Sequence, residues 1–225
     1  MKIALIGYGK MGHVVERIAE QRGHKIVCRI DMGEEQKFET PDFRSADVAI
    51  EFTQPTSAIQ NYRRAWKAGV PVVSGTTGWT SQMDEVKKEM TAMGGSFFWT
   101  SNFSLGVNIV MQINKRLAEM MRGYEGYSVE MTEVHHTQKK DAPSGTAIVL
   151  ADQIEANYGI RPAIESIREG MVPGIHEIRY NSDVDIITLR HEAKSRDGLA
   201  LGAVLAAEFM KDRTPGFYDM NDLMK

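Results

Sequence analysis

Residues that could transfer protons and bind anions are concentrated in one stretch, Glu133–Ala147, which reads EVHHTQKKDAPSGTA. His135 and His136 are adjacent, so on a strand they would point to opposite faces and only one would enter a given site. Lys139 adds positive charge. Imidazole titrates near neutral pH, which suits a general acid or base. The sequence therefore predicts proton-transfer chemistry here.

The end of this stretch, Ser144-Gly145-Thr146, is predicted to open a helix. Backbone N–H groups and hydroxyls at a helix amino end suit a carboxylate or phosphate. Taken alone, each feature has an ordinary explanation: surface histidines, a solvated lysine loop, a helix cap. Their combination favours catalysis. No third ligand follows the histidine pair at a metal-like spacing, so we predict no metal site.

A glycine pattern directly follows the apolar strand Lys2–Ile6 and reads Gly7-Tyr8-Gly9-Lys10-Met11-Gly12. Gly7 permits a tight turn, Gly9 lets backbone approach a pyrophosphate, and Gly12 allows close helix packing. Asp31 lies nineteen residues beyond Gly12, where a carboxylate accepts hydrogen bonds from ribose hydroxyls. This pattern predicts a dinucleotide site.

The choice of cofactor depends on charge near the ribose. Asp31 repels a 2′-phosphate and favours NADH, and Met32 offers no compensating charge. Lys10, Arg29 and Lys37 are close enough in sequence to reach a phosphate. We expect NADH preference or use of both NADH and NADPH.

The elements that must position these residues alternate along the first half of the chain. Predicted strands are Lys2–Ile6, Lys25–Ile30, Val48–Phe52, Val70–Ser74 and Phe97–Thr100, with helices between them, including Thr56–Ala68 and Thr80–Met93. Such alternation predicts an α/β fold with a Rossmann-like, doubly wound parallel sheet. Loops after the fourth and fifth strands, Gly75–Gly78 and Ser101–Ser104, are either ligand-binding or ordinary loops.

The pattern changes to α+β beyond Asn102. We predict helices at Leu105–Met121, Thr146–Tyr158 and Gly198–Lys211, and strands at Tyr127–Val134, His176–Tyr180 and Asp185–His191. We expect a dinucleotide-binding domain at 1–103, a smaller α+β substrate-binding and oligomerisation domain at 104–198, and a return of 199–225 to the first domain. Met32–Ala46 is polar and is predicted as a loop.

Composition sets limits on partners and compartment. The 225 residues carry a formal net charge of −3, so no bulk positive field attracts nucleic acid or an anionic membrane. No apolar run approaches the ~20 residues that span a bilayer. The single cysteine, Cys28, excludes an internal disulfide framework. Met1–Gly7 has the pattern of a buried strand rather than a signal peptide, and we expect a cytoplasmic protein.

The pattern E-x-H-H-x-x-K-x-D-A-P-S-G-T-A resembles the motif of the dihydrodipicolinate reductase family of the diaminopimelate route to lysine. Further similarity lies at Gly7–Gly12, Glu51–Thr53, Gly75–Gly78, Asn102–Asn108, Arg168–Gly170 and Phe217–Met220. The resemblance implies reduction of 4-hydroxy-tetrahydrodipicolinate, a small dicarboxylate, by NADH or NADPH. It also implies a homotetramer built through the sheet of the substrate domain.

The resemblance also implies roles for individual residues. It places the acid/base on His135 and a proton donor on Lys139. It places substrate contacts on His136, Lys139, Gly145 and Thr146, and the predicted helix end adds Ser144 as a candidate substrate contact. It places cofactor contacts on Gly7, Tyr8, Gly9, Lys10, Met11, Gly12, Asp31, Gly75, Thr76, Thr77, Thr100, Ser101, Asn102 and Phe103. The chain departs from the family by shortened segments around Met32–Ala46 and Pro173–Asp185, a glycine loop one residue tighter, and Met32 in place of a basic residue.

Three other functions stay open at this point. A semialdehyde dehydrogenase would need a cysteine nucleophile, and Cys28 lies inside a predicted strand. An amine dehydrogenase acting on an open-chain diamino acid would need the same cofactor and the same anion site. A catalytically silent nicotinamide-binding sensor would not need His135 and Lys139.

Overall fold

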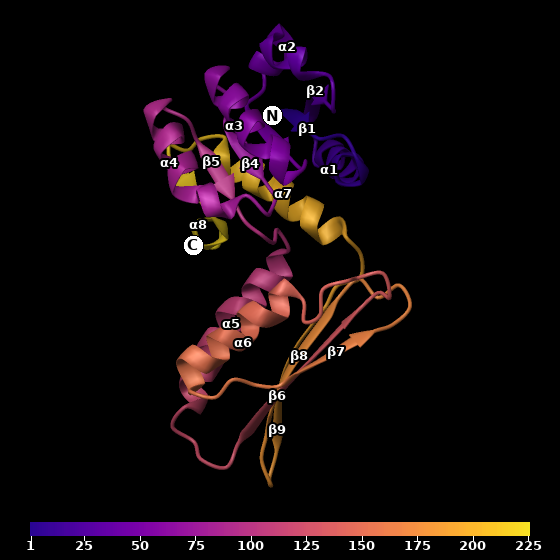
Figure 1. The fold of residues 1–225 in the computed structure, drawn as a ribbon, viewed down its shortest axis with the longest axis vertical. Coiled ribbons are helices and arrows are strands. Elements are labelled where there is room, and N and C mark those ends of the chain that lie inside the picture. Colours follow the sequence, from indigo (N-terminus) through magenta and orange to yellow (C-terminus); the bar gives the residue numbers. More distant parts are fainter. The chain divides into compact units, whose positions relative to one another are not determined.

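A computed structural model describes residues 1–225 (Figure 1). The chain divides into two compact units, one formed by Met1–Ser104 with Asp197–Lys225 and the other by Leu105–Arg196. None of the helices combines the length and the apolar character that crossing a membrane requires.

The first unit is built on a parallel sheet whose six strands lie in the order β10-β5-β4-β3-β1-β2. The strands are β1 (Lys2–Ile6), β2 (Lys25–Ile30), β3 (Val48–Glu51), β4 (Val72–Ser74), β5 (Phe97–Trp99) and β10 (Phe217–Tyr218). β3 and β4 are buried at every position, as expected of strands with both faces covered. The predicted Rossmann-like sheet is confirmed.

Helices cover both faces of this sheet. They are α1 (Lys10–Gln21), α3 (Pro55–Lys67), α4 (Met83–Ala92, preceded by the 3-10 turn η2, Thr80–Gln82), α7 (Asp197–Met210) and α8 (Met220–Leu223). Successive side chains of β5 show the two faces, because such side chains point in opposite directions. The Phe97 ring meets Tyr62 and Trp66 of α3, whereas the Phe98 ring meets Phe209 of α7.

The prediction of a loop at Met32–Ala46 is wrong. This segment contains a 3-10 helix, η1 (Glu35–Glu39), and a short helix, α2 (Pro41–Arg44). The Thr40 hydroxyl caps α2 by accepting a hydrogen bond from the Phe43 N–H at 3.3 Å. Phe38 and Phe43 are buried with their rings edge to face, so two aromatic side chains anchor an otherwise polar segment.

The second unit has a mixed sheet in the order β7-β6-β8-β9. Its strands are β6 (Ser128–His135), β7 (Ile164–Arg168), β8 (Ile175–Asn181) and β9 (Ile186–Glu192). The helices α5 (Leu105–Met121) and α6 (Gly145–Tyr158) lie side by side (Figure 1), and their apolar side chains share a core with those of the sheet. Strand β7 was not predicted; it runs parallel to β6 and aligns Arg168 with His135.

Candidate active site

The glycine loop before α1 explains two glycines by packing and leaves the third for a ligand. Gly7 has a φ of 89°, and a β-carbon there would overlap the carbonyl oxygen of Phe52. A β-carbon on Gly12 would meet the carbonyl oxygen of Gly7. A β-carbon on Gly9 would meet no atom of the chain within 4 Å. Gly9 is therefore not required by internal packing, and its exposed backbone suits a bound pyrophosphate.

A cleft of about 340 Å³ lies against this loop within the first unit. Gly7, Gly9 and Asp31 line it, so the structure brings together the predicted turn and the predicted ribose carboxylate. Sequence reasoning missed several lining residues: Ile6, Ile30, Glu35, Phe52, Thr53, Gln54, Thr56, Ser57 and Asn61. Of the other predicted cofactor residues, Tyr8 and Met11 are half-buried and Lys10 is exposed. The arrangement fits a dinucleotide at a helix amino end.

Charges near Asp31 argue against a 2′-phosphate. The Arg29 guanidinium forms an ion pair with Glu16, and Lys37 Nζ lies 2.7 Å from a Glu34 carboxylate oxygen. A further acid, Glu35, lines the cleft. Two of the three cations that could compensate Asp31 are therefore already paired.

The loops after β4 and β5 hold the remaining cofactor candidates. Thr76 is buried, accepts a hydrogen bond from the Thr53 N–H at 2.8 Å and donates to Glu51 at 3.0 Å. Glu51 is fully buried, and burial raises the pKa of its carboxyl. It was not predicted as a site residue. Gly75 is half-buried against the Phe52 ring, whereas Thr77 is exposed.

The loop after β5 folds on itself. The Asn102 N–H donates to the Thr100 hydroxyl at 3.2 Å, and the Ser104 N–H donates to the Asn102 side chain at 2.8 Å. Ser101 is exposed, but Phe103 is buried with its ring stacked on Phe98. Phe103 as a whole is 1% exposed, so neither its ring nor its backbone is open to solvent in this structure.

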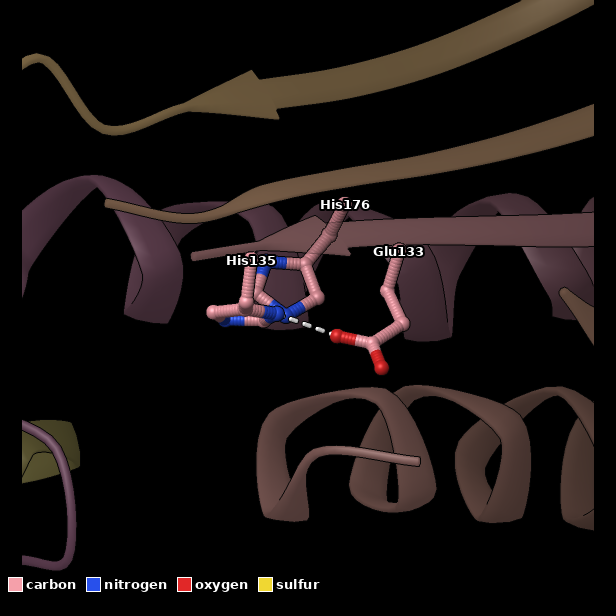
Figure 2. A group of neighbouring side chains, drawn as sticks. All are labelled: Glu133, His135 and His176. Atoms are coloured by element: carbon pink, nitrogen blue, oxygen red, sulfur yellow. Dashed lines mark ion pairs between the residues drawn. The ribbon is translucent and has the colours of Figure 1, made fainter. Parts of the chain in front are cut away.

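The acid–base cluster is formed in the second unit. Glu133 and His135 are two residues apart on β6, so both point to the face that α5 and α6 cover. His135 Nδ1 forms an ion pair with Glu133 (Figure 2), and Arg168 Nη2 lies 2.8 Å from the other carboxylate oxygen. Burial raises the pKa of Glu133, but the hydrogen bond from Arg168 and the nearby positive charges outweigh it and leave this pKa lowered.

The neutral form of His135 is favoured by its surroundings. Burial lowers the pKa of His135, and the attraction of Glu133 offsets this only in part, because Lys139 and Arg168 add positive charge. His136, the next residue, is half-buried. It lies just beyond the end of β6, which finishes at His135, so the expected alternation of the two histidines across one strand does not apply.

Lys139 carries a counter-ion. Its ammonium lies 2.8 Å from an Asp141 carboxylate oxygen, and its side chain is 23% exposed. Its backbone N–H donates to the His136 carbonyl at 3.0 Å, which closes a turn after β6. A dicarboxylate that binds Lys139 must share this ammonium with Asp141 or displace it.

Ser144 caps the amino end of α6. Ser144 is buried, and its hydroxyl accepts a hydrogen bond from the Ala147 N–H at 3.2 Å. Gly145 is exposed and Thr146 is half-buried in the first turn. The Ser144 N–H donates to Glu133 at 3.3 Å, so the acid–base cluster and the helix end are joined.

His176 completes the cluster and was not predicted as a site residue. It lies opposite Glu133 in the pairing of β6 with β8, and its ring meets that of His135 edge to face (Figure 2). Its Nε2 is 3.2 Å from the Ser144 hydroxyl. No local pattern marks this residue, since its place depends on the register of two strands far apart in sequence.

The cluster offers one carboxylate and two imidazoles, which are ligand types of transition-metal sites. The ligand atoms of its three residues, Glu133, His135 and His176, lie within 4.8 Å of one another. However, Arg168 is bonded to Glu133, and the charge of Lys139 acts on both imidazoles. The positive charges of Arg168 and Lys139 repel a metal cation at this position. The chemistry of the three side chains therefore suits proton transfer better than metal binding.

Stability should fall in acid because of His176. Burial lowers its pKa to about 4, so between pH 6.5 and 4 the unfolded chain takes up a proton that the folded chain resists. We expect the free energy of unfolding of the wild type to drop over this range by up to about 3 kcal/mol more than that of His176→Gln. Urea denaturation followed by circular dichroism measures this; replacing the exposed His13 is the control. Equal losses in the wild type and His176→Gln would contradict it.

The nucleotide cleft in a parallel α/β unit and the acid–base cluster in a separate α+β unit define the class, a two-domain pyridine-nucleotide-dependent reductase. Residues 1–103 match the family description "Dihydrodipicolinate reductase, N-terminus", and residues 106–224 match "Dihydrodipicolinate reductase, C-terminus". The chain belongs to the dihydrodipicolinate reductase family.

Individual relatives agree with this family. The chain is 44% identical to a 4-hydroxy-tetrahydrodipicolinate reductase of Christiangramia forsetii, over 100% of this chain and 98% of the relative. It is 34% identical to that of Staphylococcus haemolyticus, over 99% and 100%. Among solved structures, a dipicolinate-bound dihydrodipicolinate reductase from Paenisporosarcina sp. TG-14 has a TM-score of 0.80 at 20% identity, covering 97% of each chain. This likeness in structure shows the same fold.

Proposed function

We propose that the chain reduces 4-hydroxy-tetrahydrodipicolinate to tetrahydrodipicolinate with a reduced pyridine nucleotide, in the biosynthesis of diaminopimelate and lysine. One observation supports this most: Glu133 contacts both His135 and the amino end of α6. A proton-transfer group and an anion-binding helix end are thereby combined. The first unit is the dinucleotide-binding domain, and the second is the substrate-binding domain.

The substrate carries two carboxylates, and this chain has a net charge of −3, so local groups must hold it. We place one carboxylate at Ser144, Gly145 and Thr146, where the helix end favours negative charge. Lys139 and His136 add charge and hydrogen bonds. The dipicolinate in the Paenisporosarcina structure is a dicarboxylate of this kind.

His135 and Lys139 divide the proton transfers. At neutral pH His135 is mostly neutral, so it is suited to take a proton from the ring carbon beside the one that bears the hydroxyl. Lys139 gives a proton to that hydroxyl, which leaves as water. The bound cofactor would supply a hydride to the ring carbon that carried the hydroxyl. His135 then returns its proton, and the substrate has gained one hydride and lost one hydroxide.

The cofactor contacts follow from the cleft. Gly7, Gly9 and Gly12 with their neighbours would hold the pyrophosphate, and Asp31 the adenosine ribose. The loops at Gly75–Thr77 and Thr100–Phe103 would contact the nicotinamide half.

NADH is the preferred cofactor in this proposal. We expect a higher kcat/KM with NADH than with NADPH, because Asp31 and Glu35 repel a 2′-phosphate while Arg29 and Lys37 are paired. Asp31→Ser should shift the ratio toward NADPH by about tenfold, which corresponds to roughly 1.4 kcal/mol. Asp42→Asn, an exposed change in the same unit, is the control. A strong wild-type preference for NADPH would contradict this role of Asp31.

We further propose a cytoplasmic homotetramer assembled through the sheet of the second unit. Apolar residues are exposed at the start of the edge strand β9, which leaves apolar surface for a partner: Val184, Ile186 and Ile187 are 87%, 49% and 36% exposed. Cys28 is buried and free, which suits a reducing compartment. Light scattering of the purified chain measures the assembly.

The turnover assay tests the proposed function. NADH and NADPH loss is followed on adding the condensation product of pyruvate and aspartate semialdehyde, with an open-chain diamino acid in parallel. Loss with the cyclic substrate alone supports the reductase. Turnover of the open-chain amine alone would favour an amine dehydrogenase, and no turnover of either would favour a sensor.

A further inference from the structure

We propose that Glu133 is a positioning residue that holds the imidazole of His135 and the amino end of α6 in one arrangement, with Arg168 as its counter-charge. The inference rests on the proposed function, in which His135 moves a proton and α6 holds a carboxylate. In this arrangement Glu133 keeps the proton-transfer group and the carboxylate-binding helix end in position to act on the same substrate molecule.

The two carboxylate oxygens of Glu133 serve different partners. One contacts His135 Nδ1, a contact that becomes an ion pair when His135 is protonated (Figure 2). The other lies 2.8 Å from Arg168 Nη2 and accepts a hydrogen bond from the Ser144 N–H at 3.3 Å. Glu133 is fully buried, so these partners take the place of water. A single side chain therefore joins the proton-transfer group to the helix cap.

Strand pairing builds this arrangement. Glu133 and His135 share one face of β6 because side chains two apart point the same way. The parallel pairing of β6 with β7 sets Arg168 directly beside His135. Arg168 Nη2 also donates to the Asp141 carbonyl at 2.6 Å, which ties the loop after β6 to the same carboxylate. Three separate segments thus meet at Glu133.

The burial of Glu133 requires its counter-charge. A carboxylate without water is costly unless it is paired and fully hydrogen-bonded. Arg168 and the Ser144 N–H serve one carboxylate oxygen, and the other oxygen has His135 Nδ1 beside it. A carboxylate beside Nδ1 favours the tautomer with its proton on Nδ1. Nε2 then carries the lone pair that accepts a proton from substrate.

The space beside Nε2 is also preserved. Gly174, which precedes β8, lies against this atom, and a β-carbon there would be 3.1 Å from Nε2. Glycine leaves this side of the ring uncrowded. The proton-accepting nitrogen therefore faces backbone without a side chain in the way.

Glu133 is the negative charge that acts most strongly on the pKa of His135. The other groups that act on His135 are Arg168 on β7, His176 on β8 and Lys139 in the loop, while His191 on β9 acts in turn on His176. Removing the charge of Glu133 must therefore lower the pKa of His135 further. If neutral His135 is the active form, the acid limb of the kcat profile moves to lower pH.

Glu133→Gln tests the inference in the full-length chain. We expect kcat to fall by about 10²-fold, the acid limb of its pH profile to shift to lower pH, and KM for the dicarboxylate to rise. The dissociation constant for NADH, measured by fluorescence, should stay unchanged because the cofactor contacts lie in the first unit. Glu130→Gln is the matched control: Glu130 is on the same strand, points to the opposite face and has a 59% exposed side chain. Its kinetics should equal those of the wild type.

A second measurement does not depend on activity. Nitrogen-15 NMR of wild-type histidines reports which ring nitrogen carries the proton, and the spectrum of His135→Asn assigns the signal. The inference predicts a neutral His135 with its proton on Nδ1. A proton on Nε2, or a Glu133→Gln enzyme with wild-type kcat and pH profile, would overturn it. Failure of the wild type to consume NADH would refute the proposed function instead, and the NMR result would still decide the role of Glu133.

Discussion

His135→Ala is expected to lower kcat by about 10²-fold or more while cofactor affinity stays nearly constant. A positioned acid/base contributes about 10²–10⁴-fold to a rate, which is roughly 3–5 kcal/mol. His135 is 8% exposed and lies in the second unit, so its loss leaves the glycine loop and Asp31 untouched. Steady-state kinetics and NADH binding by fluorescence measure the two quantities.

The control for this experiment is His24→Ala. His24 lies in the turn between α1 and β2 and contacts Glu208 at 2.6 Å, outside both clusters, so its replacement should leave kcat at the wild-type value. Circular dichroism separates loss of catalysis from loss of folding. Full activity in a folded His135→Ala enzyme would show that another group handles the proton.

Lys139→Ala is expected to damage kcat and substrate affinity together. In the proposed mechanism its ammonium both protonates the leaving hydroxyl and binds a carboxylate, so one change removes two interactions. We expect kcat to fall by about 10²-fold and KM for the dicarboxylate to rise by about tenfold. Removal also leaves the Asp141 carboxylate without its counter-ion near the bound dicarboxylate.

Lys140→Ala separates this role from general charge. Lys140 is the next residue, is exposed, and changes the net charge by the same amount. It should alter KM far less than Lys139→Ala does. An unchanged KM in Lys139→Ala would remove the binding role of this lysine and leave only proton donation.

Features encoded within short segments could be predicted from the sequence. The strands of the parallel sheet followed from apolar runs separated by helical patterns, and the cleft lined by Gly7, Gly9 and Asp31 lies where the glycine pattern predicted a ligand. The start of α6 followed from Ser144-Gly145-Thr146 ahead of an apolar helix. Each of these signals is contained in a short segment of the chain.

Features that depend on strand pairing could not be predicted. Arg168 meets Glu133 only because β7 runs parallel to β6, and His176 reaches Ser144 only because β8 pairs with β6 in one register. The residues involved are 35 and 32 positions apart. The same limit hid the pairing of Arg29 with Glu16, which changes the interpretation of the cations near Asp31.

The proposed substrate site has less excess positive charge than its residue types alone suggest. The sequence stretch has two adjacent lysines, yet Lys139 is paired with Asp141 and Arg168 with Glu133. The affinity for a dicarboxylate must therefore come from specific hydrogen bonds and the α6 end more than from excess positive charge. A single substitution in the proposed substrate site should therefore have a large effect on the affinity for the dicarboxylate.

The most direct test of the central claim is a crystal structure with NADH and a pyridine dicarboxylate bound together. The account predicts one carboxylate at the amino end of α6, within hydrogen-bond distance of Gly145, and Lys139 Nζ beside the ligand. It also predicts the nicotinamide C4 at about 3–3.5 Å from the ring carbon that receives hydride. A dicarboxylate bound away from His135 and Lys139, or held far from the nicotinamide in the assembled protein, would contradict it.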